Sequence, residues 1–278
     1  MNAPFVLFGV PDVHGLFRAK LYPAARFATL VESDGFRISS LVLALDPADQ
    51  PISTLEGIGL TVGAGDLHLR PDLTTMRDLQ TPVRWQLCLG DLLDTEGIAS
   101  CLAPRAVLQG VLARRTEPTV VRAAFEYEFR LSDVGRDERP RTYAALSLAS
   151  VNQFLERFAA ALEDASIELV GLHTEPAVGL FEVNVAAGDV LRAADDAFFL
   201  RLIARLAARS CGYQASFLAK PAAEEEGSGG HLHLSVWAAD QTNTFHNLAD
   251  HRRPSDRLRH AVGGLLALMP SFAAIYNP

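Results

Sequence analysis

Two glutamates one residue apart, Glu126 and Glu128, lie within the aromatic segment Phe125–Phe129. Alternate side chains of an extended strand point to opposite faces, so both carboxylates share one face and the aromatic rings share the other. The rings would hold the strand in the core and leave two like charges side by side. Such a pair either raises the pKa of one carboxyl group or requires a cation between them. A strand with one solvated face explains the same pattern without any chemistry.

Two alternating histidines, His231 and His233, follow directly on the glycine-rich segment 227–230. Ser235 continues their face, while the leucines and the valine between them form an apolar face that we expect helices to cover. A single histidine in a strand is usually a core residue. Two histidines in alternation after a glycine-rich loop favour a ligand-binding role.

A third motif places Glu175 and Glu182 on either side of the turn residues Pro176 and Gly179. Proline and glycine at this spacing predict a hairpin that brings the two carboxylates together, although acidic residues flank many hairpins. Four glutamates with one or two histidines form a mostly oxygen donor set, which suits Mg²⁺ or Mn²⁺ better than zinc or copper. The sequence therefore predicts a divalent metal site.

The elements that must position these residues change in character at about residue 100. Residues 1–100 contain short apolar runs broken by Pro, Gly and Asp, which predict a strand-rich domain. Residues 101–278 show helical periodicity between paired strands, which favours an α+β class with a mainly antiparallel or mixed sheet. Helices are expected from Pro104, over about 147–164, from 189 to a cap at Gly212, and from the N-cap Ser255; strands are expected at about 120–131, 166–173, 180–185, 213–219 and 231–238.

Composition excludes several classes of protein. A hydrophobic share of 49% argues against disorder, and a net charge of −8 without a basic patch argues against nucleic-acid binding. The three cysteines, Cys88, Cys101 and Cys211, form no metal or disulfide pattern and favour a reducing compartment. No basic segment precedes the first apolar run, and no stretch approaches the roughly 18 apolar residues of a membrane span. We therefore expect a soluble, cytoplasmic protein with no membrane partner.

The order of these motifs resembles the glutamine synthetase family over nearly the whole chain. Asp12–Lys20 is similar to the Asp-x-x-Gly-x-x-Arg-x-Lys segment of that family, and Asp66–Asp72 resembles the stretch that closes its small β-grasp domain. Lys220-Pro221 followed by Gly227–Ser235 resembles its Lys-Pro … Gly-x-x-x-His-x-His-x-Ser signature. The resemblance implies an N-terminal β-grasp domain and part of a glutamine-synthetase-type catalytic domain, with helices on one side of its sheet.

The resemblance also implies two metal positions. Glu128, Glu175 and Glu182 match the glutamates that hold the metal nearer the amino-acid substrate. Glu126 and His231 match the ligands of the metal that bridges the ATP phosphates. The metal implied at both positions is Mg²⁺ or Mn²⁺.

The resemblance implies a reaction as well. His233 and Ser235 would line the nucleotide-phosphate side of the site. The γ-carboxylate of glutamate would attack the γ-phosphate of ATP, and ammonia or a small amine would displace phosphate from the γ-glutamyl phosphate. In the family the site lies between two subunits of a ring, so a homo-oligomer is implied.

Several positions depart from the family pattern. Glu226 stands where ammonia-using members usually have Asn, and an acidic residue there is similar to branches that ligate larger amines, including polyamines. Leu180 replaces a usual Gln, and Asp34-Gly35 does not continue into the Asp-Gly-Ser-Ser loop that helps bind ammonium. The chain ends at Pro278, before the Asn-Ser-Tyr-Lys-Arg segment and the later arginines. We therefore expect a catalytic domain that is incomplete at its C-terminal end.

Three functions follow from these observations. The first is an ATP-dependent carbon–nitrogen ligase that acts on glutamate and ammonia or an amine. The second is a non-catalytic scaffold, regulatory homologue or inactive fragment that retains metal binding only. The third is a different metal-dependent phosphotransferase such as a guanidino kinase, which fits less well because those enzymes bind the nucleotide with arginines.

Overall fold

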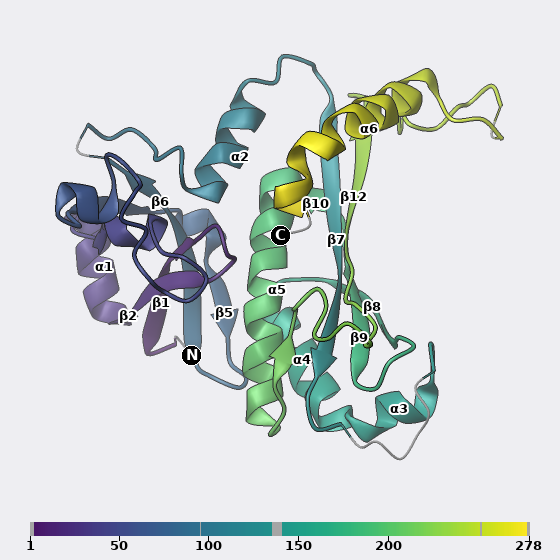
Figure 1. Ribbon diagram of the computed structural model, residues 1–278, viewed down its shortest axis with the longest axis horizontal. Helices are drawn as coiled ribbons and strands as arrows, with labels where there is room; N and C mark the ends of the chain where they lie inside the picture. The colour runs from purple at the N-terminus through teal and green to yellow at the C-terminus, as the bar shows by residue number, and fades with distance from the viewer. Residues whose placement is uncertain (1–2, 95, 135–140, 251, 277–278) are drawn as a thin grey trace.

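Two sheets separated by a long helix form the molecule, as a computed structural model shows for residues 3–94, 96–134, 141–250 and 252–276 (Figure 1). The elements of the N-terminal half are β1 (Phe5–Pro11), β2 (Phe17–Pro23), α1 (Ala24–Glu32), β3 (Arg37–Ser39), β4 (Asp66–Pro71), β5 (Arg77–Leu79) and β6 (Trp85–Leu93). Those that follow are α2 (Pro104–Ala113), β7 (Val120–Leu131), α3 (Ala145–Ser150), α4 (Asn152–Asp164), β8 (Leu169–Thr174), β9 (Leu180–Val185), β10 (Gly188–Asp189), α5 (Val190–Ser210), β11 (Ala215–Ser216), β12 (Gly230–Trp237) and α6 (Asp256–Tyr276).

The first sheet has the strand order β2-β1-β6-β4-β3, with β5 paired to β6. Its central strands β1 and β6 run parallel, and all its other strand pairs are antiparallel. Phe8 of β1 packs edge-on against Phe27 of α1 and against Phe36, so helix α1 covers one face of this sheet. These residues belong to a buried apolar cluster that draws on the first 103 residues alone.

The second sheet is built around the long strand β7. Strands β9 and β10 pair with one edge of β7, β11 and β12 pair with the other, and every pairing is antiparallel. Phe129 of β7 is fully buried among Phe154 and Phe158 of α4 and Phe181 of β9. Helices α4 and α5 therefore cover the apolar face of the sheet (Figure 1). The expected α+β class and the expected aromatic face of this strand are confirmed.

The helix expected over 147–164 is two helices. Helices α3 and α4 are separated at Val151, whose φ of −114° and ψ of 21° leave the helical region. Val151 is 1% exposed, so its side chain belongs to the core and preserves the apolar spacing across the break. The apolar periodicity of the sequence therefore continues across residue 151, although the helix is interrupted there. The other helix ends agree with expectation: Pro104 is the first residue of α2, Ser255 accepts a bond from the Leu258 amide, and Gly212 has a φ of +85° after α5.

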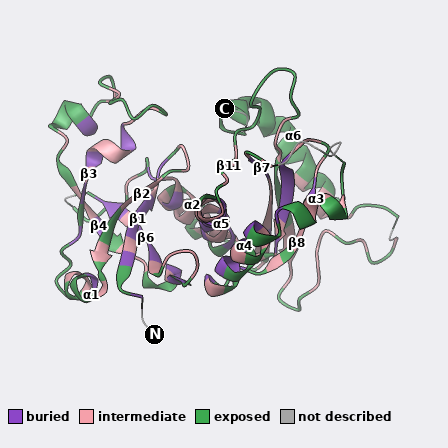
Figure 2. Ribbon diagram, turned by 90° about the horizontal axis from the view of Figure 1, so that it is seen from below, coloured by how far each residue is buried: buried purple, intermediate pink, exposed green. Residues whose placement is uncertain are grey.

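The prediction that helices cover the apolar face of β12 is wrong, because Leu232 and Leu234 on that face are 52% and 43% exposed. The helices that cover the second sheet pack on β7, β8, β10 and β11 and leave this part of β12 open. Most residues of α6 are exposed as well, as Figure 2 shows.

Helix α6 also corrects the expectation that no segment is long and apolar enough to span a membrane. Among the described residues, this one helix of 21 residues passes that test by length and composition, with a mean hydropathy of 1.4. A single helix of this kind is weak evidence for a membrane span.

An ion cluster joins the two sheets at their seam. Arg105 of α2 is 6% exposed and contacts three carboxylates: Asp72 at 2.7 Å, Asp91 at 2.9 Å and Asp195 at 3.0 Å. Asp91 lies on β6 and Asp72 directly follows β4, whereas Asp195 lies on α5. Burial raises the pKa of Asp195, while hydrogen bonds from Thr74 and Arg105 outweigh burial and lower the pKa of Asp72.

The three free cysteines differ in burial. Cys88 is fully buried in β6, and burial raises the pKa of its thiol to about 12, whereas Cys101 is exposed. Because the thiolate is the reactive form, a thiol reagent at neutral pH should label Cys101 rapidly and Cys88 only in denaturant. Mass spectrometry of the labelled, digested chain measures this order, and rapid native labelling of Cys88 would contradict the described packing.

Candidate metal centre

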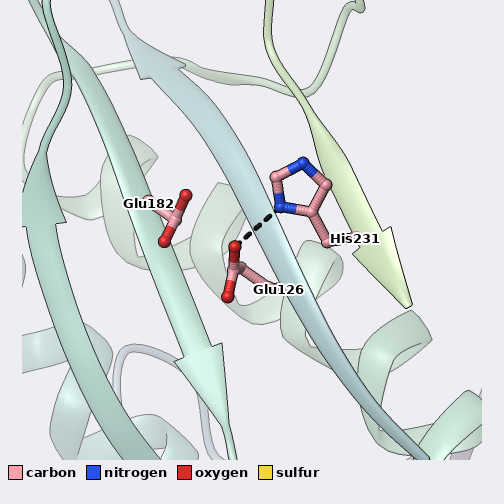
Figure 3. A group of neighbouring side chains, drawn as sticks. All are labelled: Glu126, Glu182 and His231. Atoms are coloured by element: carbon pink, nitrogen blue, oxygen red, sulfur yellow. Dashed lines mark hydrogen bonds and ion pairs between the residues drawn. The ribbon is translucent and has the colours of Figure 1, made fainter. Parts of the chain in front are cut away.

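Three adjacent strands, β9, β7 and β12, hold the candidate ligands side by side (Figure 3). In the register of the sheet, Glu126 of β7 lies opposite His231 of β12 on one edge and opposite Asn184 of β9 on the other. Glu128 lies opposite Glu182 of β9. The alternation predicted for each strand therefore places these side chains on the face opposite the aromatic core.

Glu126 is the centre of the first group of ligands. His231 Nδ1 lies 2.7 Å from Glu126 Oε1, and His233 Nε2 lies 3.3 Å from Glu126 Oε2. The hydrogen bond with His231 lowers the pKa of Glu126, and the same bond raises the pKa of His231. Asn184 donates to Glu126 and to Glu182, at 3.3 Å in the second case, and so links neighbouring carboxylates.

The second group surrounds Glu182 on its other side. His173 Nε2 lies 2.8 Å from Glu175 Oε1 and 3.5 Å from Glu182 Oε1. The His173 ring stacks on Tyr143 at 4.3 Å between centroids, which fixes its orientation. Burial raises the pKa of Glu182, and the nearby charges of Glu126 and Glu175 raise it further. A neighbouring cation would therefore favour the charged form of Glu182.

These residues fit a divalent metal ion. Ligand atoms of Glu126, Glu182 and His231 all lie within 4.8 Å of one another, and so do those of His173, Glu175 and Glu182. The two groups share Glu182, and their donors are mainly carboxylate oxygens, which Mg²⁺ and Mn²⁺ prefer. Carboxylates this close repel one another unless a positive charge lies between them. The structure thus unites Glu126, Glu175, Glu182 and His231 of the predicted metal set.

Glu128 belongs to neither group and instead lines a pocket beside them. This pocket has a volume of about 370 Å³, and its walls include Glu128, Glu175 and the loop Glu226–Gly229. A Cβ atom at Gly229 would lie 2.9 Å from Glu128 Oε1 and 3.3 Å from His231 Nε2. Glycine at this position therefore allows the loop to approach the ligands closely.

The two predicted nucleotide-side residues lie along β12 on the face of His231. His233 contacts Glu126, as described above, and the hydroxyl of Ser235 accepts a 2.8 Å hydrogen bond from the Trp237 indole. The roles of His233 and Ser235 stay predictions, as do the metal roles of Glu126, Glu128, Glu175, Glu182 and His231.

Sequence reasoning assigned no role to His173 or Asn184, although both lie within hydrogen-bond reach of the candidate ligands. The signal was a spacing of two residues: Asn184 follows Glu182 on the same face of β9, and His173 precedes Glu175.

Residues 101–278 match the model of the glutamine synthetase catalytic domain. The chain belongs to the glutamine synthetase family. This confirms the resemblance seen in the motifs and the type of catalytic domain it implied. The division into domains 1–100 and 101–278 stays a prediction.

Two relatives of this member of the glutamine synthetase family have the names of glutamate–amine ligases. It is 30% identical to a glutamate–isopropylamine ligase from Pseudomonas sp over 292 residues, with 100% of the chain and 64% of the relative covered. It is 29% identical to a gamma-glutamylputrescine synthetase from Escherichia coli K12, with 100% and 62% covered. A crystal structure of a novel glutamine synthase homolog superimposes with a TM-score of 0.88 at 27% identity, with 99% of this chain and 65% of the other covered. The chain thus spans less than two thirds of the length of these relatives.

Proposed function

We propose that this protein is an ATP-dependent ligase that joins the γ-carboxylate of glutamate to an amine through a γ-glutamyl phosphate. The observation that carries the proposal is the convergence of two overlapping acidic ligand groups beside a pocket lined by Glu128 and the glycine-rich loop. Membership of the glutamine synthetase family supports it. The comparisons favour neither a non-catalytic scaffold nor a guanidino kinase.

Different residues of the chain would have different roles in such a reaction. Glu126, Glu182 and His231 would hold one ion, and His173, Glu175 and Glu182 would adjoin the second, with Glu128 facing the amino-acid side. Bound there, Mg²⁺ or Mn²⁺ neutralises charge on the anionic substrates and orients the phosphoryl transfer. The close packing of these carboxylates and the glycine loop that approaches them support a site built around cations.

A second, larger pocket supports an amine rather than ammonia as the acceptor. It has a volume of about 740 Å³ and shares Pro176 and Glu226 with the first pocket. Asp133, Glu225 and Glu226 line it, and Arg130 is the basic residue among the described residues of its wall. The Arg130 guanidinium donates to the carbonyl oxygens of Val178 at 3.1 Å and Glu226 at 2.9 Å. The acidic side chains therefore outnumber the base and favour a positively charged substrate.

The test is ADP release by the protein in its full natural length, with glutamate, Mg²⁺ or Mn²⁺, and a panel of ammonia, ethanolamine, isopropylamine and putrescine. We expect amine-dependent turnover that requires glutamate and is lost with a chelator. Absence of amine-dependent ADP release across the panel, in protein that binds the metal, would refute the proposal.

Glu226→Gln should raise the KM for putrescine several-fold and change the KM for ammonia little. The substitution removes one negative charge from the wall shared by both pockets, and an exposed charge pair contributes about 0.2–1 kcal/mol. Steady-state kinetics of both amines measures the difference. Glu224→Gln is the matched control, because Glu224 is exposed and lines neither pocket. Equal effects of the two variants would remove Glu226 from the amine site.

A further inference from the structure

Two arginines of α5 lack the partners that the other buried arginines have. Arg201 and Arg205 are half-buried and stand four residues apart, hence on one face of the helix. Within the described residues, neither guanidinium group makes a hydrogen bond or has a carboxylate oxygen within 4.0 Å. By contrast, Arg105 and Arg77 at the seam between the sheets each contact an aspartate at 3.0 Å or less.

The surroundings of the two guanidinium groups compensate their charge only in part. Arg201 and Arg205 lie over the ring of Phe217, at 5.3 Å and 5.2 Å from its centroid. Cation–π contacts of this kind are weaker than a hydrogen-bonded ion pair. The Nε atom of Arg201 is buried without a partner among the described residues. Burial lowers the pKa of Arg205, and the charge of Arg201 lowers it further.

Arg201 lies where the first sheet meets α5. Gly15, in the turn between β1 and β2, has a φ of +71°, and a Cβ atom there would lie 2.8 Å from Arg201 Nη1. The guanidinium of Arg201 therefore rests against the turn of the Asp12–Lys20 motif. The ring of Phe217 packs edge-on against Tyr127, which alternates with Glu126 and Glu128 along β7. The arginines thus lie on the opposite face of the second sheet from the metal centre.

We propose that Arg201 and Arg205 form a binding site for a phosphate group, separate from the metal centre. Two half-buried like charges on one helix face repel each other, and a dianion that both guanidinium groups contact would relieve the repulsion and supply the missing hydrogen bonds. Guanidinium groups match the geometry of phosphate oxygens because they donate in pairs. The phosphate belongs either to free inorganic phosphate or to a small phosphomonoester, since both present the same oxygens. This inference does not rest on the proposed ligase activity.

The test is thermal unfolding of the full chain with increasing inorganic phosphate, in EDTA so that no metal contributes, against NaCl of equal ionic strength. We expect a saturable rise of Tm with a Kd on the order of 1 mM. Arg201→Met and Arg205→Met should each raise that Kd about tenfold or more, because each removes charged hydrogen-bond donors. Arg209→Met is the matched control, since Arg209 is exposed in the last turn of the same helix.

Further measurements keep the test independent of folding. In NaCl alone, Arg205→Met should unfold at a Tm no lower than the wild type, because it removes a repelled charge, so loss of phosphate binding is not loss of fold. Arg205→Lys should bind phosphate with intermediate affinity. A titration with glycerol phosphate separates the two sources, and tighter binding than inorganic phosphate assigns the site to an organic phosphate. Equal phosphate affinity in all variants, or no saturable effect in the wild type, would overturn the proposal.

Discussion

Replacing Glu126 by Gln should lower the affinity of the chain for Mn²⁺ by about a hundredfold. Substitutions that merely support a metal ligand cost about 10–100-fold in affinity, and Glu126 is itself a candidate ligand at the centre of its group. Glutamine keeps the shape of the side chain but removes the charge that faces His231 and His233. Calorimetric titration with Mn²⁺ at constant pH measures the change.

Glu168→Gln is the matched control for that experiment. It removes the same charge from an exposed position just before β8, outside both ligand groups. The control should bind Mn²⁺ like the wild type. If the two variants lost affinity equally, the loss would reflect the net charge of the chain, and the candidate metal centre would be wrong.

Arg105→Met should lower the free energy of unfolding by about 3–5 kcal/mol, the usual cost of leaving a buried charge without its partner. Three carboxylates, of Asp72, Asp91 and Asp195, would share the seam with no cation at its centre. Urea unfolding followed by circular dichroism measures the loss. Arg114→Met, exposed at the end of the same helix, should change stability little.

The penalty for Arg105→Met should also depend on pH. In the wild type the pKa of Asp72 is lowered, so Asp72 contributes stability above its unfolded pKa and loses it as the pH falls through its folded pKa. In the variant, protonation of the clustered carboxylates relieves their repulsion. The difference in the free energy of unfolding between wild type and variant should therefore become smaller as the pH is lowered. A difference that stays constant across the acidic range would show that the lost stability comes from packing and not from charge.

Local patterns in the sequence were sufficient to predict the site strands. Alternation in Phe125–Phe129 and in His231–Ser235 fixed which side chains share a face, because the period of a strand is two residues. Helix ends at Pro104 and Gly212 followed from backbone chemistry that acts within one turn. These features depend on near neighbours in the chain, so they could be predicted without the fold.

The remaining features depend on contacts between distant segments. Asn184 reaches Glu126 only because β9 and β7 pair in one register, and a slip of one residue would turn it away. The break between α3 and α4 falls at Val151, whose buried side chain keeps the apolar spacing continuous across it. Likewise, the three carboxylates around Arg105 come from separate elements. The neighbouring residues in the sequence do not predict such partners.

Strand β7 pairs with strands that come both soon after it and much later in the sequence, so the residues of the candidate metal centre are synthesised at different times. Glu126 and His231 are 105 residues apart in the chain, whereas β8 and β9 are joined by a short turn. Because a chain is synthesised from its N-terminus, β7, β9 and Glu175 between β8 and β9 leave the ribosome before β12 supplies its histidines. The carboxylates are therefore synthesised before His231. A metal ion that binds Glu126, Glu182 and His231 together would bind only after β12 pairs with β7, and by binding the folded form it would stabilise that pairing.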